Sequence, residues 1–252
     1  MSKKFLLVSV LSATLSGCEY IHQLNDPGEI DSLYVSIGAI QSIEIAAPCS
    51  LVLTNRSSDE ILKARGCDYI LNDYNFNNEN GKLVIGHKNG DLIQKEKMAT
   101  IWVQAGSTPY ITANSACVIT NDADTLFLDK LAIVVNGRGM YTETDLTVRC
   151  LQLNLATYGR SNQASHQLKG TTSSLQTHLE GCALLDASNM TARDVWVYHQ
   201  SVADCFFRAD SSLTVTFASS GNIYYKGKPS VTTSRQTIPF MSASGRLYPL
   251  SD

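Results

Sequence analysis

The side chains best suited to catalysis or metal binding are scattered along this sequence. None of the five histidines forms an HExxH or HxH motif, which would place two imidazoles on one metal: His22, His87, His166, His178 and His199. The aspartates fall mostly at expected turns, where this residue bonds its own backbone: Asp122, Asp124, Asp186, Asp194, Asp204 and Asp210. A glycosidase needs two carboxyl groups about 5–10 Å apart. We therefore expect no catalytic residue, no metal site and no cofactor.

Tyrosines and arginines beside glycine-containing turns are better candidates for binding. Tyr141, Tyr158, Tyr224 and Tyr225 follow or flank such turns, and a row of rings on one face would suit sugar stacking or a protein contact. In "NGRG" and "YGR" two arginines, Arg138 and Arg160, occupy equivalent positions and could present a small anion-binding ladder. The competing interpretation is that the rings pack over neighbouring strands and the arginines are simply solvated.

The N-terminus predicts export and lipid attachment. Lys3 and Lys4 precede an apolar run that is too short to span a bilayer, as in a signal peptide. It ends in Leu15-Ser16-Gly17-Cys18, which resembles the bacterial lipobox. That resemblance implies a signal peptide over residues 1–17, cleavage before Cys18, acylation of its thiol and a tether over residues 18–33. Glu19 would follow the anchor, which favours the outer membrane and leaves its periplasmic or surface side open.

Composition indicates a folded, exported chain. Charged residues make up 17% of its 252 residues and hydrophobic residues 44%, and the net charge of −3 offers no field for capturing nucleic acid. Beyond Cys18, six cysteines form no CxxC pair but could form disulfides in an oxidising compartment, in pairings that the sequence leaves open: Cys49, Cys67, Cys117, Cys150, Cys182 and Cys205.

From Tyr34 onward apolar residues alternate with polar ones, as in β-strands, and from Ile111 the pattern repeats. Six small residues expected at sharp corners are separated by 23, 20, 22, 22 and 18 positions: Ala116, Gly139, Gly159, Gly181, Ala203 and Gly221. A period near 20 residues predicts a β-solenoid, in which stacked coils bury columns of inward side chains. A β-sandwich is the alternative.

His178 and His199 precede two corners and could stack on neighbouring coils. We expect the asparagine-rich segment "NDYNFNNENG" (72–81) to be a turn.

Several segments resemble the bacterial family known as the putative auto-transporter adhesin head, or GIN domain. The matching segments are "IQSIEIAAPCSLVLTNRSSDEI", "GKLVIGHKNG", "ATIWVQAGSTPYITANSACVI" and a closing "SSGNIYYKGKPSV", which is similar to the family's G-x-I-x-Y-x-G-x-P. The corners at Ala116 and Ala203 and the segment "LEGC" depart from the family's pattern. The resemblance implies a right-handed β-helix-like solenoid over residues 34–235, preceded by antiparallel strands, in a cell-envelope protein, and it supplies no catalytic residue.

Together these features predict a noncatalytic, lipid-anchored envelope protein that serves in adhesion or surface interaction. Its partners would be the membrane, through the lipid, and a glycan or an envelope or host protein. A periplasm-facing structural or signalling-associated module and a carbohydrate-active β-helix enzyme are the two alternatives. The tail, residues 236–252, is a candidate cap for the open end of the solenoid, with Thr237–Phe240 as the covering segment.

Overall fold

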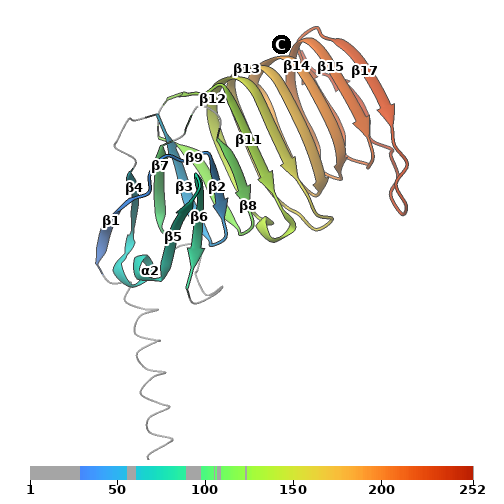
Figure 1. Ribbon diagram of the computed structural model, residues 1–252. Coiled ribbons are helices and arrows are strands. Elements are labelled where there is room, and N and C mark those ends of the chain that lie inside the picture. The colour runs from blue at the N-terminus through green and yellow to red at the C-terminus, as the bar shows by residue number, and fades with distance from the viewer. Residues whose placement is uncertain are drawn as a thin grey trace, which may run out of the picture.

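Most strands of this protein pair with the coil before and the coil after them, so the chain winds into a solenoid. The computed structural model describes residues 29–55, 61–88, 98–104, 106, 109–122 and 124–251. It is a β-solenoid of about six turns with coils of about 22 residues, which confirms the predicted fold (Figure 1). Cys18, His22, the signal peptide and most of the tether lie outside the described residues.

The chain enters the fold at β1 and leaves it after β18. The N-terminal part contains β1 (Ile30–Ser36), β2 (Ser42–Ile45), β3 (Cys49–Thr54), β4 (Ile61–Cys67), α2 (Asp68–Asp73), β5 (Tyr74–Glu79), β6 (Lys82–His87), β7 (Thr100–Gln104), β8 (Tyr110–Ala113) and β9 (Cys117–Asn121). The C-terminal part contains β10 (Leu126–Phe127), β11 (Lys130–Val135), η2 (Gly137–Gly139), β12 (Glu143–Thr157), β13 (Ser165–Gly181), β14 (Leu184–Ser201), β15 (Cys205–Phe217), β16 (Ile223–Lys226), β17 (Ser230–Arg235) and β18 (Leu247–Pro249). Residues 30–33, which we had assigned to the tether, are therefore the first half of β1.

Each long strand rounds a bend and so contributes to two faces of the solenoid. In β12 the buried positions are even-numbered as far as Cys150 and odd-numbered from Leu153, and β13 makes the same change between Thr172 and Leu175. Side chains alternate sides along a strand, so a change of phase marks the bend. We call the arm before the bend the first face and the arm after it the second face.

Both faces continue into the N-terminal part through parallel pairing. On the first face β12 pairs with β9, which pairs with β3, which pairs with β7. On the second face β12 pairs with β11, followed in turn by β8, β2 and β6. Antiparallel pairs occur at the N-terminal edge of the described fold, in β1–β4, β4–β7 and β5–β6. The predicted antiparallel strands are thus confined to this edge.

The segment "NDYNFNNENG" is mostly strand, so its interpretation as a turn was wrong. Residues 74–79 form β5, and the turn into β6 is Asn80-Gly81 alone, with φ of 53° and 81°. Two consecutive residues with positive φ make the tight hairpin that Asn-Gly favours. The asparagine density misled the sequence analysis because Phe76, packed against the core, holds the segment in the sheet.

The interior is a set of columns that run through successive coils. One column on the second face is in strand register, and each of its members is at most 2% exposed: Leu131, Leu153, Leu175, Val195 and Leu213. Burying a branched side chain contributes about 1.5–3 kcal/mol. Because a single coil has no interior of its own, this stabilisation arises only when coils stack.

The small corner residues form two separate columns. Val135, Thr157 and Leu179 share a register, which aligns Gly137, and not Gly139, with Gly159 and Gly181. Gly221 lies directly against Ala203, since a Cβ on Gly221 would be 2.2 Å from the Ala203 carbonyl oxygen. Gly245 repeats this contact with the Gly221 carbonyl, so the tail begins another coil.

At the C-terminal end the tail adds part of a further coil through Gly245 and β18, whereas Phe240 of the expected covering segment is exposed. The Phe240 side chain is 99% exposed. Arg235 instead lies over the Phe217 ring, 5.4 Å from its centroid, and donates hydrogen bonds to the carbonyls of Ala243 and Gly245. β18 pairs with β16 and extends the first face. A hollow of about 540 Å³ remains here, lined in part by Arg246 and Leu247.

Two histidines are buried in the core. Both ring nitrogens of His166 contact threonine hydroxyls, Thr157 at 3.0 Å and Thr144 at 3.1 Å. His199 points inward, with its ring edge toward Phe217, and its nitrogens face the backbone of Ala203 and Gly221. Burial lowers the pKa of each imidazole to about 4. The predicted pairing of His178 with His199 was therefore wrong, because His178 points outward.

Gly170→Ala should destabilise the protein strongly. Gly170 has a φ of +107°, and a Cβ there would be 2.2 Å from the Val148 carbonyl oxygen, so the two coils would have to separate. We expect a loss of about 2–4 kcal/mol in chemical denaturation. Gly137→Ala is the matched control, because a Cβ there meets nothing within 4 Å. Equal losses in the two variants would contradict the close approach.

The buried histidines should make the fold sensitive to acid. Each folded pKa of about 4 lies below the unfolded value of about 6.5, so the unfolded chain takes up protons that the fold excludes. Stability should be complete above pH 6.5 and fall toward pH 4, by about 2 kcal/mol per histidine at pH 5. Denaturation of His199→Leu at pH 7.5 and 5.0 should show a smaller loss than wild type, whereas His178→Gln should not.

Candidate functional site

Three rings form a continuous stack on the outside of the second face. We call Tyr158, His178 and Tyr198 the His178 ladder. Its ring centroids are 4.8 Å apart between Tyr158 and His178 and 4.6 Å apart between His178 and Tyr198. His178 and Tyr198 are in strand register in β13 and β14, and Tyr158 follows directly on β12. The ladder therefore exists because three successive coils place these residues side by side.

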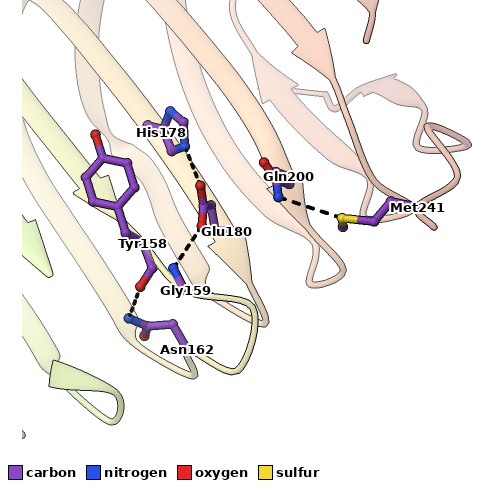
Figure 2. Close-up of polar contacts among 7 residues, drawn as sticks. All are labelled: Tyr158, Gly159, Asn162, His178, Glu180, Gln200 and Met241. Atoms are coloured by element: carbon purple, nitrogen blue, oxygen red, sulfur yellow. Dashed lines mark hydrogen bonds and ion pairs between the residues drawn. The ribbon is translucent and has the colours of Figure 1, made fainter. Parts of the chain in front are cut away.

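Glu180 holds the ladder in place. Its carboxylate accepts a hydrogen bond from the Gly159 backbone N–H at 2.8 Å and contacts His178 Nε2 at 3.0 Å (Figure 2). The Asn162 side chain donates to the Tyr158 carbonyl at 3.1 Å. Partial burial, and then the Glu180 charge, raise the pKa of Tyr198. These contacts fix the ring edges before any ligand arrives.

The surface around the ladder is polar. Beside it lies a register column in which Trp196, 43% exposed, stands among amide and hydroxyl side chains: Asn154, Gln176, Trp196 and Thr214. The His178 and Tyr198 rings are stacked face to face at 23°, whereas the Tyr158 ring is tilted by 44° against His178. The Trp196 indole adds an aromatic surface next to them. Such a face can donate and accept hydrogen bonds along the solenoid axis.

A second stack stands on the first face, near the C-terminal end. We call Phe206, Tyr224 and Tyr248 the Tyr224 ladder. Its centroid spacings are 5.2 and 5.3 Å, and its residues are in register in β15, β16 and β18. Tyr248 belongs to the last strand of this face, so the ladder ends there. The loop preceding the ladder is fixed by Asp204, which accepts from the Asn222 backbone N–H at 2.8 Å.

The structure distributes the predicted ligand contacts unevenly. Tyr158 and Tyr224 each belong to a ladder, whereas Tyr225 points inward in register with Phe207 and packs against the core. Tyr141 is exposed on a turn with a φ of +71° and belongs to neither ladder. Arg138 and Arg160 are exposed one coil apart, because the register aligns Gly137 with Gly159.

His178 does stack on rings of the neighbouring coils, as its place before a corner had suggested. The other members of these surfaces were not predicted from the sequence: Tyr198, Phe206, Tyr248 and Trp196. Strand register places Ala156 beside His178 and His178 beside Tyr198, so Tyr158 reaches the His178 ring from two positions further along its coil. The equal steps of 20 residues between the three aromatic side chains were the signal in the sequence. The steps of the Tyr224 ladder are 18 and 24 residues, because loops of different length separate its strands. Only the strand register identifies that set.

The described acidic residues act mainly in local structure. Asp186 lies within β14 and not at a turn, so that prediction was wrong for this residue, although its carboxylate accepts from the Ser188 backbone N–H at 2.9 Å. Asp194 accepts from Ser212 at 2.7 Å and from Arg193 at 2.8 Å, and these bonds lower its carboxyl pKa. Within the described part of the chain no three His, Cys, Asp or Glu side chains come together as a metal site would require.

An open groove of about 610 Å³ lies where the strands bend between the two faces. Its walls include the exposed side chains of Phe127 and Leu151, together with Arg149 and Asp129. Cys150 lies beneath them and donates from its thiol to Thr172 Oγ1 at 3.5 Å. Burial raises the pKa of this thiol, so it is a poor nucleophile. The groove offers an apolar contact surface and a single pair of opposite charges.

Solved structures with the same fold carry names that refer to adhesion or lipid binding. A "putative adhesin" from Bacteroides fragilis superposes with a TM-score of 0.67 at 17% identity, over 88% of this chain and 97% of that one. A "putative adhesin" from Parabacteroides merdae gives 0.60 at 14%, over 88% and 97%. A "putative lipid binding protein" from Parabacteroides distasonis gives 0.62 at 13%, over the same shares. At these identities the likeness shows the fold alone.

Sequence comparison identifies the family. Among curated proteins no match was found. The family model described as "Putative auto-transporter adhesin, head GIN domain" matches residues 39–229, within the 34–235 that the motifs had indicated. The matched range contains both faces of the solenoid, the whole His178 ladder and two members of the Tyr224 ladder. The chain therefore belongs to the auto-transporter adhesin head GIN domain family.

Proposed function

We propose that this protein is a noncatalytic, lipid-anchored protein of the bacterial cell envelope that binds glycans through the outward side of its second face. The observation that carries the proposal is the His178 ladder, which Glu180 fixes in an exposed position. Membership of a family named for adhesion supports a binding role at the envelope. The outer membrane is the proposed location.

A glycan suits this face better than a compact protein partner does. A protein interface usually centres on a buried apolar cluster, whereas the columns beside the ladder consist mainly of amides and hydroxyls. Those groups repeat with the spacing of adjacent strands, about 4.8 Å. An extended chain of sugars could bond to several coils in succession while its C–H surface lies against Trp196. The solenoid thus offers an elongated binding surface.

Attachment through the N-terminus is consistent with the direction in which the chain runs. The chain enters at β1, at the end of the solenoid opposite β17 (Figure 1). A lipid on Cys18 would therefore leave the C-terminal coils farthest from the point of attachment. Of the helices that the structure describes, none is long and apolar enough to cross a membrane.

Tyr158→Ala, Trp196→Ala and Tyr198→Ala should each weaken glycan binding about tenfold, because an aromatic contact contributes on the order of 1 kcal/mol or more. Binding can be measured on a glycan array and then by calorimetry with the best ligand. Tyr34→Ala is the matched control, since Tyr34 is 63% exposed on β1 at the far edge. Capture of an envelope protein without any glycan would refute the proposed ligand class.

Cys18→Ser should release the protein from the membrane, because it removes the thiol that the lipobox predicts to be acylated. Fractionation of cells that express each form, together with labelling by an alkyne fatty acid, measures this directly. We expect labelled, membrane-bound wild type and unlabelled, soluble variant. Protease treatment of intact cells then tests which side of the outer membrane the protein faces. Degradation indicates the cell surface, and protection until the envelope is broken indicates the periplasm.

A further inference from the structure

Two cysteines that are far apart in sequence are direct neighbours in the fold. Cys49 begins β3 and Cys117 begins β9, and the parallel register of these strands pairs the two residues with each other. The other described cysteines have different neighbours: Cys67 lies opposite Ile30, Cys150 beside Thr172, and Cys205 between Leu185 and Ile223. Cys182 is exposed at a corner. Among the described strand pairings, the register thus brings together one pair of cysteines.

The register of this pair is compatible with a disulfide, although both residues are free thiols in this structure. Paired strands lie about 4.7–4.9 Å apart, within the range of about 4.4–6.8 Å that disulfide-linked Cα atoms span. Both side chains point into the core, with exposures of 0% for Cys49 and 2% for Cys117. Neighbours in parallel register direct their side chains to the same side, so the two sulfur atoms share one column.

The buried column that contains Cys49 and Cys117 requires small side chains, but it does not require cysteine. The register continues the column through Ala99 on one side and through Thr142, Ala164 and Ala183 on the other. Thr142 Oγ1 lies 3.6 Å from Cys117 Sγ. Alanine therefore fits this column at three positions, and packing does not require cysteine. Two adjacent cysteines in a chain with an export signal are better explained by a bond between them.

We propose that Cys49 and Cys117 form a disulfide that ties β3 to β9. The loop that it closes contains β4 to β8, including the antiparallel N-terminal edge. The oxidant is a disulfide of the thiol–disulfide exchange class. One cysteine thiolate attacks that disulfide, forms a mixed disulfide and releases a thiolate. The second cysteine then attacks the mixed disulfide at the protein sulfur and releases the other thiolate, so the oxidant gains two electrons and, after protonation, two protons.

The bond has to form while the protein folds. Burial raises the pKa of Cys117 to about 12 and that of Cys49 well above its ordinary value. Thiols in this state contain almost no thiolate and exchange slowly. Oxidation should therefore occur during export or refolding, before the column closes.

Peptide mapping tests the proposal. The full-length protein is exported in a bacterial host, solubilised in detergent, alkylated under denaturing conditions without reductant, and digested with trypsin and endoproteinase Glu-C. We expect one linked pair, Ile45–Arg56 joined to Met98–Lys130, which separates on reduction. Refolding of the reduced chain in a mixture of oxidised and reduced glutathione should give the same pair. Alkylation of the exposed Cys182 confirms that the reagent reacted.

The Cys49→Ala/Cys117→Ala variant provides the control for stability. Alanine suits the column, so the variant should fold, and reductant should leave its melting temperature unchanged. Reductant should lower the melting temperature of wild type and of Cys150→Ala by on the order of 5–15 °C. The proposal is overturned if both thiols are alkylated in exported and refolded protein, or if either is linked to another cysteine.

Discussion

Parallel, in-register stacking of coils is the constraint on which the rest of the structure depends. Each strand satisfies its backbone hydrogen bonds with the neighbouring coils, so a residue is fixed relative to residues about 22 positions away. Inward positions then become continuous columns, such as the one from Leu131 to Leu213. The same closeness leaves no room for a side chain at Gly170, where a Cβ would meet a carbonyl oxygen of the preceding coil.

Stacking of the coils also brings outward side chains together, and this forms the proposed binding surface. Tyr158, His178 and Tyr198 come from three coils and stack because the coils stack. Glu180 accepts a hydrogen bond from the Gly159 backbone N–H of the preceding coil and also contacts His178, so it links two coils of the ladder (Figure 2). A surface of this kind needs no lid and no moving loop.

The ends of a solenoid expose strands that could pair with other chains, and the two ends of this protein have different structures. At the N-terminal edge β1, β4 and β5 turn antiparallel, and Lys63 lies over the rings of Tyr34 and Trp102. At the C-terminal edge Arg235 covers Phe217 and bonds the carbonyls of the tail. A charged side chain thus lies over an aromatic ring near each end of the solenoid.

The sequence alone determined that the chain is a β-solenoid, since alternation and a recurring corner are local patterns, and the closing "SSGNIYYKGKPSV" indicated its family. It also indicated Tyr158 and Tyr224 as surface rings. The tertiary structure decided what depends on register: Tyr225 points inward while Tyr224 points outward, His199 is buried while His178 is not, and Cys49 faces Cys117. Whether a side chain points inward or outward changes with a shift of one residue along the strand, and the Cys49–Cys117 contact depends on pairing between strands that are distant in sequence. Local periodicity cannot supply that information, because loops of unequal length separate the coils.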